Sequence, residues 1–184
     1  MCYRAPGAAA SPQAPQGLSM LNLLMKSASR KQEARRLYDV VVSRAREPVF
    51  FARFGVADSV DGRFDMLAFH AWLVLRELKG ADPAQGLIDV IFTGFDEAMR
   101  EQGVGDMGIG HKLKAMAQAF YGRMAAYDGA ATQEDLAAAL AKNIWRGASP
   151  DVSARKLAAY AFAARPHLAA SLPGALDFGP LPTI

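Results

Sequence analysis

The residues that most often build metal or acid–base sites are few in this chain and widely spaced. Histidine occurs at only three positions, His70, His111 and His167, and no two of them stand four residues apart. The single cysteine, Cys2, lies close to the N-terminus, and no H-E-x-x-H motif occurs. A zinc site therefore has no set of ligands, and no histidine pair offers axial ligands for haem. We expect no metal and no cofactor.

One of these histidines, His70, falls in the most apolar stretch of the chain, between Met66 and Leu75. A lone imidazole on an apolar helix is more typical of an interior side chain with a hydrogen-bond partner than of a base or a ligand, because catalysis needs further groups around it. We therefore predict a structural role for His70.

The motifs for nucleophilic catalysis and nucleotide binding are missing or lack their context. Neither G-x-S-x-G nor a Walker-type glycine-rich loop occurs. Residues 103–108 match G-x-G-x-x-G, but a helix is predicted before them in place of the strand that a dinucleotide site requires. We interpret this run as a connection, in which Gly103 or Gly105 ends one helix in a left-handed conformation and Asp106 caps the next helix.

Several charged residues, Asp96, Glu97, Arg100 and Glu101, share one predicted helix. Paired carboxylates can carry general acid–base chemistry, but the sequence pattern gives these neither a cleft nor a partner base. Asp96 and Arg100 are instead spaced for an ion pair between successive helical turns. We therefore predict that the chain is not an enzyme.

Length and composition indicate one globular domain. The chain has 184 residues, of which 52% are hydrophobic and 21% are charged, and this balance allows a core and argues against disorder throughout. No run of about 18 apolar residues predicts a membrane-spanning helix. The charge is uneven: residues 1–46 are basic, residues 47–110 are acidic, and the rest is mildly basic. No dense basic face predicts specific binding of nucleic acid.

Apolar residues recur at helical spacing along most of the chain, and no alternating strand pattern rises above them. The strongest helix covers residues 63–79, where apolar residues on both sides predict a central position in a bundle. Further helices are predicted at 31–46, 83–102, 111–128, 132–145 and from 151 to about 165. We predict an all-α, single-domain bundle of about six to seven helices, with a disordered N-terminal extension at 1–19, the helical domain at 20–171 and a C-terminal tail at 172–184.

A short amphipathic segment follows the N-terminal extension, with apolar residues before a basic cluster. Its candidate residues for contact with a membrane are Leu21, Leu24, Lys26, Arg30 and Lys31. Such a segment either lies on an anionic membrane surface or docks on the body of the domain, and amphipathic spacing alone does not separate these alternatives. Met20, at the start of this segment, is a second candidate for the natural start of the chain beside Met1.

Two segments, and the spacing between them, carry the features of a known family. The first is LAFHAWLVLREL at 67–78, which contains His70-x-Trp72. The second is IFTGFDEAMREQGVGDMGIGHKLKAMAQAFYGRMAAYD at 91–128, in which the glycine-rich run precedes the FYGR block. Together these segments resemble the ubiquinol–cytochrome c chaperone family, and the resemblance covers roughly residues 33–147.

The resemblance implies an assembly factor for the cytochrome bc1 complex that binds newly made cytochrome b or another bc1 subunit. Mitochondrial members of the family work beside a small partner protein and the ribosome. The chain lacks a convincing transit peptide, which favours a bacterial-type member. The implied location is the cytoplasm, with a peripheral position at the inner membrane, or the mitochondrial matrix if the source is eukaryotic.

The helix–loop–helix within the resemblance carries the candidate partner-binding residues. They are Arg100, Asp106, Lys112, Lys114, Tyr121 and Arg123. These side chains either form a polar face for the partner or serve in capping and in ion pairs within the chain, which contribute little stability at a surface.

Two other functions stay open. A helical carrier or enzyme for an apolar small molecule such as a quinone would have His70 and Tyr121 lining an enclosed cavity. A ribosome or nucleic-acid binder would use the basic residues 26–46, and its binding would depend steeply on salt.

Overall fold

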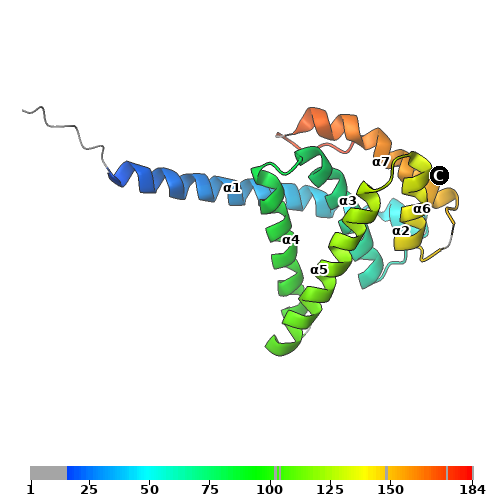
Figure 1. Cartoon of the computed structure of the whole chain (residues 1–184), viewed down its shortest axis with the longest axis horizontal. Coiled ribbons are helices and arrows are strands. Elements are labelled where there is room, and N and C mark those ends of the chain that lie inside the picture. Colours follow the sequence, from blue (N-terminus) through cyan, green and yellow to red (C-terminus); the bar gives the residue numbers. More distant parts are fainter. Residues whose placement is uncertain (1–15, 102, 104, 148, 173, 184) are drawn as a thin grey trace, which may run out of the picture.

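The computed structural model describes residues 16–101, 103, 105–147, 149–172 and 174–183, and these residues contain helices but no strand. Seven helices follow one another in this part of the chain and form one bundle (Figure 1). Their bounds are α1 Gln16–Ala45, α2 Pro48–Ala52, α3 Val60–Leu78, α4 Asp82–Glu101, α5 Asp106–Asp128, α6 Gln133–Ile144 and α7 Val152–Ser171. The prediction of an all-α bundle of about six to seven helices is confirmed.

Helix α3 is the centre of the bundle, as its two apolar faces predict. It contacts α1, α4, α5, α6 and α7, and Phe69 and Trp72 are almost fully buried. Ser59 caps the helix, because its hydroxyl accepts a hydrogen bond from the Gly62 N–H at 3.2 Å. A Cβ atom at Gly62 would lie 1.9 Å from the Ala57 carbonyl oxygen, so this close approach of loop and helix requires glycine.

Helices α4 and α5 form a hairpin that projects from the bundle (Figure 1). Gly103 has a φ of 75° and donates to the Arg100 carbonyl oxygen at 2.9 Å, so this glycine ends α4 as predicted. Asp106 is the first residue of α5 and not its cap, which is a correction to the prediction. The cap is Gly105, whose extended backbone lets its carbonyl accept the Ile109 N–H. The side chain of Asp106 lies outside the described residues.

Helix α1 is one continuous helix of 30 residues, although the pattern predicts a separate amphipathic segment before residue 31. The helix is unbroken because residues 20–46 contain neither glycine nor proline. It begins at Gln16, so residues 16–19 of the expected N-terminal extension are helical. Residues 1–15 lie outside the described residues.

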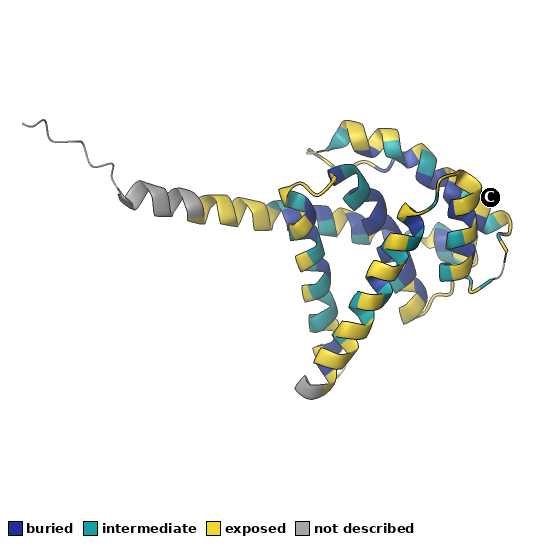
Figure 2. Cartoon of the chain, viewed as in Figure 1, coloured by how far each residue is buried: buried dark blue, intermediate teal, exposed yellow. Residues whose placement is uncertain are grey.

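The two halves of α1 differ in burial (Figure 2). A stripe that includes Ala34, Leu37, Val41 and Ala45 is buried against α3 and α4. Residues 24–32 are exposed, and this half of the helix extends away from the bundle (Figure 2). The projecting half is therefore free to contact another surface.

Helix α7 is longer than the sequence pattern predicts. Asp151 caps its N-terminus by accepting a hydrogen bond from the Ala154 N–H at 2.8 Å. The helix then continues through Pro166 to Ser171, whereas the predicted end lies at the residue before this proline. A proline removes one backbone hydrogen bond, but Leu168 in the following turn is fully buried and fixes that turn on the core.

The C-terminal tail after α7 has no helix in its described residues, but it folds back onto the bundle. Phe178 is buried, with its ring centroid 5.5 Å from that of His70. Arg44 of α1 donates hydrogen bonds to the carbonyl oxygens of Gly179 and Pro180. Its guanidinium carbon also lies 5.7 Å from the centre of the Phe178 ring. The tail therefore contributes an aromatic side chain to the core.

His70 is fully buried in this core, as predicted. Its Nδ1 donates a hydrogen bond to the Met66 carbonyl oxygen at 2.8 Å, and the Tyr160 hydroxyl lies 3.4 Å from Nε2. Burial lowers the pKa of His70 to about 3, because the charged ring would lose its hydration, and the nearby Arg44 acts in the same direction. The ring is therefore neutral at physiological pH.

We expect this neutral imidazole to make the fold sensitive to mild acid. In the unfolded chain His70 takes up a proton near its ordinary pKa of 6.5, whereas in the folded chain it does so only near pH 3. The unfolded state therefore binds more protons below pH 6.5, and the free energy of unfolding falls as the pH falls toward 3. Between pH 7.5 and pH 5 the expected loss is about 2 kcal/mol.

Urea unfolding at these two pH values measures the loss. The control is the His70→Gln variant, which cannot titrate at this position and should lose about 2 kcal/mol less over the same interval. An equal loss in the two proteins would contradict the prediction.

Candidate functional site

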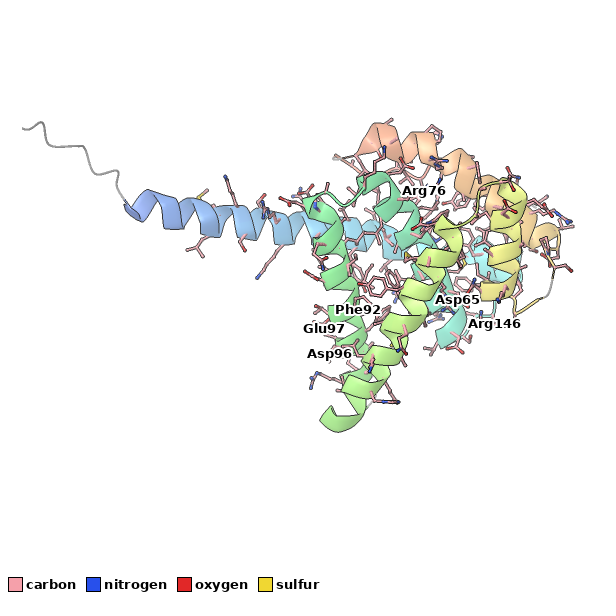
Figure 3. The ribbon with its side chains drawn as sticks, in the orientation of Figure 1. Asp65, Arg76, Phe92, Asp96, Glu97 and Arg146 are labelled. Carbon is pink, nitrogen blue, oxygen red and sulfur yellow. The ribbon has the colours of Figure 1, made fainter. Side chains whose placement is uncertain are left out.

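An aromatic cluster fills the space between the two helices of the hairpin. Phe92 of α4 stacks on Tyr121 of α5 with a centroid distance of 6.0 Å and meets Phe120 edge-on at 5.6 Å. Phe95 extends the cluster to Phe64 of α3, with a centroid distance of 5.5 Å. Figure 3 shows Phe92 between α4 and α5. These ring contacts join the two helices to each other and to the body of the bundle.

The outer edge of α5 presents an aromatic ring and a cation to solvent. Tyr121 is 50% exposed, and the exposed Lys114 precedes it by seven residues, which places both on one face about 10 Å apart along the helix. We name this surface the Lys114–Tyr121 edge. Lys112 is also exposed, but helical spacing places it on the opposite face, in line with Arg123.

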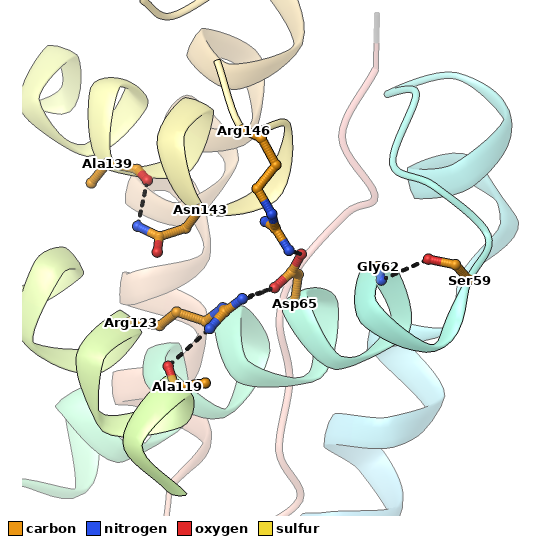
Figure 4. Close-up of polar contacts among 8 residues, drawn as sticks. All are labelled: Ser59, Gly62, Asp65, Ala119, Arg123, Ala139, Asn143 and Arg146. Atoms are coloured by element: carbon orange, nitrogen blue, oxygen red, sulfur yellow. Dashed lines mark hydrogen bonds and ion pairs between the residues drawn. The ribbon is translucent and has the colours of Figure 1, made fainter. Parts of the chain in front are cut away.

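A buried carboxylate connects the hairpin to the body (Figure 4). Asp65 of α3 is 1% exposed, and its Oδ1 accepts hydrogen bonds from Nε and Nη2 of Arg123 at 2.8 and 2.5 Å. Arg146, between α6 and α7, forms a second ion pair with Asp65 at 3.0 Å. Burial raises the pKa of Asp65, while the positive charges of the two arginines act in the opposite direction. Three parts of the bundle therefore meet at one carboxylate.

The six candidate partner-binding residues lie in different environments. Arg123 has a side chain that is 13% exposed and forms an ion pair with Asp65, which is the alternative of an ion pair within the chain. Arg100 pairs with Asp96 at 2.7 Å, as the spacing predicts. The side chain of Asp106 lies outside the described residues. The remaining candidates are exposed and form no ion pair with another described residue, and they are Lys112, Lys114 and Tyr121.

Sequence reasoning missed Asp65 and Arg146. Asp65 is the only charged residue in the apolar run 64–75, and an acid in such a run signals a buried ion pair. Its partner Arg123 follows 58 residues later, so the sequence pattern alone cannot name it.

The projecting half of α1 carries the candidate membrane-contact residues. Arg30 forms an exposed ion pair with Asp82 at the start of α4 at 2.6 Å, and a surface pair of this kind contributes little stability. The side chain of Leu21 lies outside the described residues. The remaining candidates are exposed, and they are Leu24, Lys26 and Lys31.

The space around His70 does not form the cavity that a quinone carrier would need. Phe50, Phe69 and Phe178 surround the imidazole with centroid distances of 5.0, 5.0 and 5.5 Å. Tyr121 lies on the surface of the hairpin, away from this core. The expectation that His70 and Tyr121 line one cavity is therefore wrong, because core aromatic rings occupy the space.

In the part of the chain that the structure describes, the histidine and acidic side chains include no group of three or more that could hold a metal ion. None of the described helices combines the length and the apolar character needed to cross a bilayer. Fold and site together define a helical-bundle protein with a projecting two-helix hairpin.

Comparison with known proteins identifies the family. The family model described as Ubiquinol-cytochrome C chaperone matches residues 52–175. The chain therefore belongs to the ubiquinol–cytochrome c chaperone family. The family model begins at residue 52, later than the predicted resemblance at 33–147, and it extends past that resemblance through α7.

A solved structure is also similar, the crystal structure of the Cbp3 homolog from Brucella abortus. It shares 33% sequence identity with a TM-score of 0.70, over 86% of this chain and 97% of that chain. No curated protein matches the chain.

Proposed function

We propose that the protein is a non-enzymatic chaperone for assembly of the cytochrome bc1 complex and that it binds newly made cytochrome b. The family match over residues 52–175 carries this proposal, and the name of the similar Brucella abortus structure agrees with it. An unassembled membrane protein exposes apolar segments that aggregate. A chaperone for such a client needs a rigid scaffold and an exposed contact face.

The Lys114–Tyr121 edge is the proposed contact face. Tyrosine is over-represented among the residues that contribute most to protein interfaces, since its ring buries much area with little loss of side-chain freedom. Tyr121 is half exposed and is supported from behind by its stacking on Phe92. Lys114 adds a positive charge that favours an acidic client segment. Lys112, on the other face of α5, is part of the same proposal as a second contact.

The projecting half of α1 is the proposed contact with the membrane that holds the bc1 complex. Leu24 and Met25 are 66% and 63% exposed, and Lys26 and Lys31 follow on the same exposed segment. An amphipathic helix with apolar and basic residues binds an anionic bilayer surface without crossing it. This contact would place the chaperone peripherally at the membrane, close to the site of client insertion.

Sedimentation with vesicles that contain anionic phosphatidylserine tests the membrane contact. Each lysine near an anionic surface contributes about 1 kcal/mol, so Lys26→Gln with Lys31→Gln should weaken binding roughly thirtyfold. The matched control is Lys142→Gln with Lys156→Gln on α6 and α7, which should bind like the wild type. Vesicle binding that neither the first pair of substitutions nor added salt changes would contradict this contact.

Deletion of the gene tests the proposed function as a whole. In the source organism, we expect the deletion strain to lose most of its assembled bc1 complex, measured as spectroscopically detected haem b in the isolated complex. Expression of the wild-type chain should restore it. A deletion strain with a normal content of bc1 complex would contradict the proposal.

A further inference from the structure

We infer that a pocket between α1, α3, α4 and α5 receives one large apolar side chain of the client, with an acidic group of the client at its rim. This inference rests on the proposed function and adds the chemistry by which the client is held. The pocket has a volume of ≈ 260 Å³ and opens to solvent. Its apolar wall includes Tyr38, Phe64, Leu67, Phe95, Met99 and Met116.

Small residues on α4 keep the pocket open. Gly94 and Ala98 line it one helical turn apart, where larger side chains would fill the space. A Cβ atom at Gly94 would lie 2.8 Å from the Tyr38 hydroxyl oxygen, so glycine is what allows Tyr38 to reach the pocket. The thioethers of Met99 and Met116 are flexible, and such side chains adapt to apolar groups of different shape.

The rim of the pocket is positively charged. Arg46, in the turn directly after α1, and Arg63 of α3 both line it, and both also line a neighbouring hollow. Arg63 is paired with Asp58 at 2.7 Å. Arg46 is exposed and forms no salt bridge with any residue in the described ranges. The occupant that complements an apolar interior and an unpaired guanidinium at the rim carries an apolar group beside a negative charge.

The volume favours a side chain over a free lipid or cofactor. Sites for small molecules usually enclose about 300–1,000 Å³ and bury most of the ligand, whereas this pocket is smaller and opens to solvent. Interfaces between proteins are often anchored by one aromatic or aliphatic side chain in a pocket of this kind. An apolar residue next to an aspartate or glutamate in a client segment fits both the interior and the rim.

Filling the pocket from its exposed edge tests the inference on the full-length chain. Ala98 lines the pocket but is exposed, so Ala98→Phe places a ring in the pocket without a change in the core. We expect capture of cytochrome b from solubilised membranes to fall about tenfold, equivalent to ~1.4 kcal/mol. Arg46→Gln removes the positive charge at the rim and should also lower capture of cytochrome b. The control Ala163→Phe makes the same substitution at an exposed position of α7 and should capture like the wild type.

The outcomes separate this inference from the function on which it rests. Equal capture of cytochrome b by wild type and Ala98→Phe would overturn the role of the pocket in client binding and leave the proposed function in place. A wild-type protein that captures no cytochrome b would overturn both. Native mass spectrometry that finds a lipid bound to the purified wild type but not to Ala98→Phe would also overturn the inference, because the pocket would then be a lipid site. Thermal unfolding of each variant confirms that it is folded.

Discussion

Replacing Asp65 by alanine is expected to lower the free energy of unfolding by about 3–5 kcal/mol, the cost of breaking a buried ion pair. The carboxylate is 1% exposed, and the Arg123 side chain that it binds is only 13% exposed. Without Asp65, this guanidinium would remain in the interior with no counter-charge, where it cannot recover its hydration. Urea unfolding at pH 7 measures the loss.

Two variants distinguish an unpaired buried charge from a simple loss of packing. Arg146→Ala removes the partner that is 53% exposed and should cost less than about 1 kcal/mol. Asp65→Ala combined with Arg123→Met removes both buried charges and should recover most of the stability that Asp65→Ala loses. If the double variant loses as much stability as Asp65→Ala and Arg123→Met lose together when measured singly, the explanation by an uncompensated charge is wrong.

The ion pair also determines how the hairpin is held. Arg123 lies on α5 with its guanidinium carbon 4.9 Å from the centre of the Phe64 ring, and it donates a further hydrogen bond to the Ala119 carbonyl oxygen at 2.9 Å. The same side chain therefore links α5 to α3 by charge and by ring contact. Loss of Asp65 should loosen the hairpin before it unfolds the bundle, because the other helices keep their own contacts.

The second large effect is expected at the Lys114–Tyr121 edge. Tyr121→Ala combined with Lys114→Glu should reduce capture of cytochrome b roughly thirtyfold, which corresponds to about 2 kcal/mol for a central aromatic contact. The ring is 50% exposed, so its removal takes away contact area for the client while the buried Phe120 beside it stays in place. Quantitative mass spectrometry of the captured material measures the change.

A matched control tests whether this edge is specific. Lys142→Glu combined with Val152→Ala alters an exposed cation and an exposed apolar residue on α6 and α7, with the same change in charge. The control should capture cytochrome b like the wild type. Equal losses in the two double variants would show that capture depends on general charge and not on the Lys114–Tyr121 edge.

The features that depend on local sequence were predictable. Apolar periodicity predicted six of the seven described helices, all except the short α2, and the central position of α3. The capping box of Thr132 and Asp135 at the start of α6 likewise involves residues only three positions apart. Each of these features depends on residues within a few positions of one another, where helical geometry alone relates sequence to contact. The interior position of His70 was predictable for the same reason.

The features that depend on distant contacts were not predictable. The C-terminal tail is rich in proline and glycine, which predicts an end without packing. Phe178 of this tail is nevertheless buried in the core. Arg44 of α1, more than a hundred residues away in the sequence, binds the tail next to it. Likewise, the sequence left Arg123 open between a partner contact and an ion pair within the chain, and its pairing with the buried Asp65 depends on the packing of α3 and α5. A side chain of this kind can be placed only when the packing of helices is known, since the sequence shows its charge and not its partner.

The measurement that tests the central claim most directly is affinity capture of the tagged wild-type chain from solubilised membranes of the source organism, with identification of the co-purified proteins by mass spectrometry. The account predicts cytochrome b as the main membrane protein that co-purifies, in greater amount when translation is active than after it has been stopped. Recovery of the chain without cytochrome b under both conditions would contradict the account.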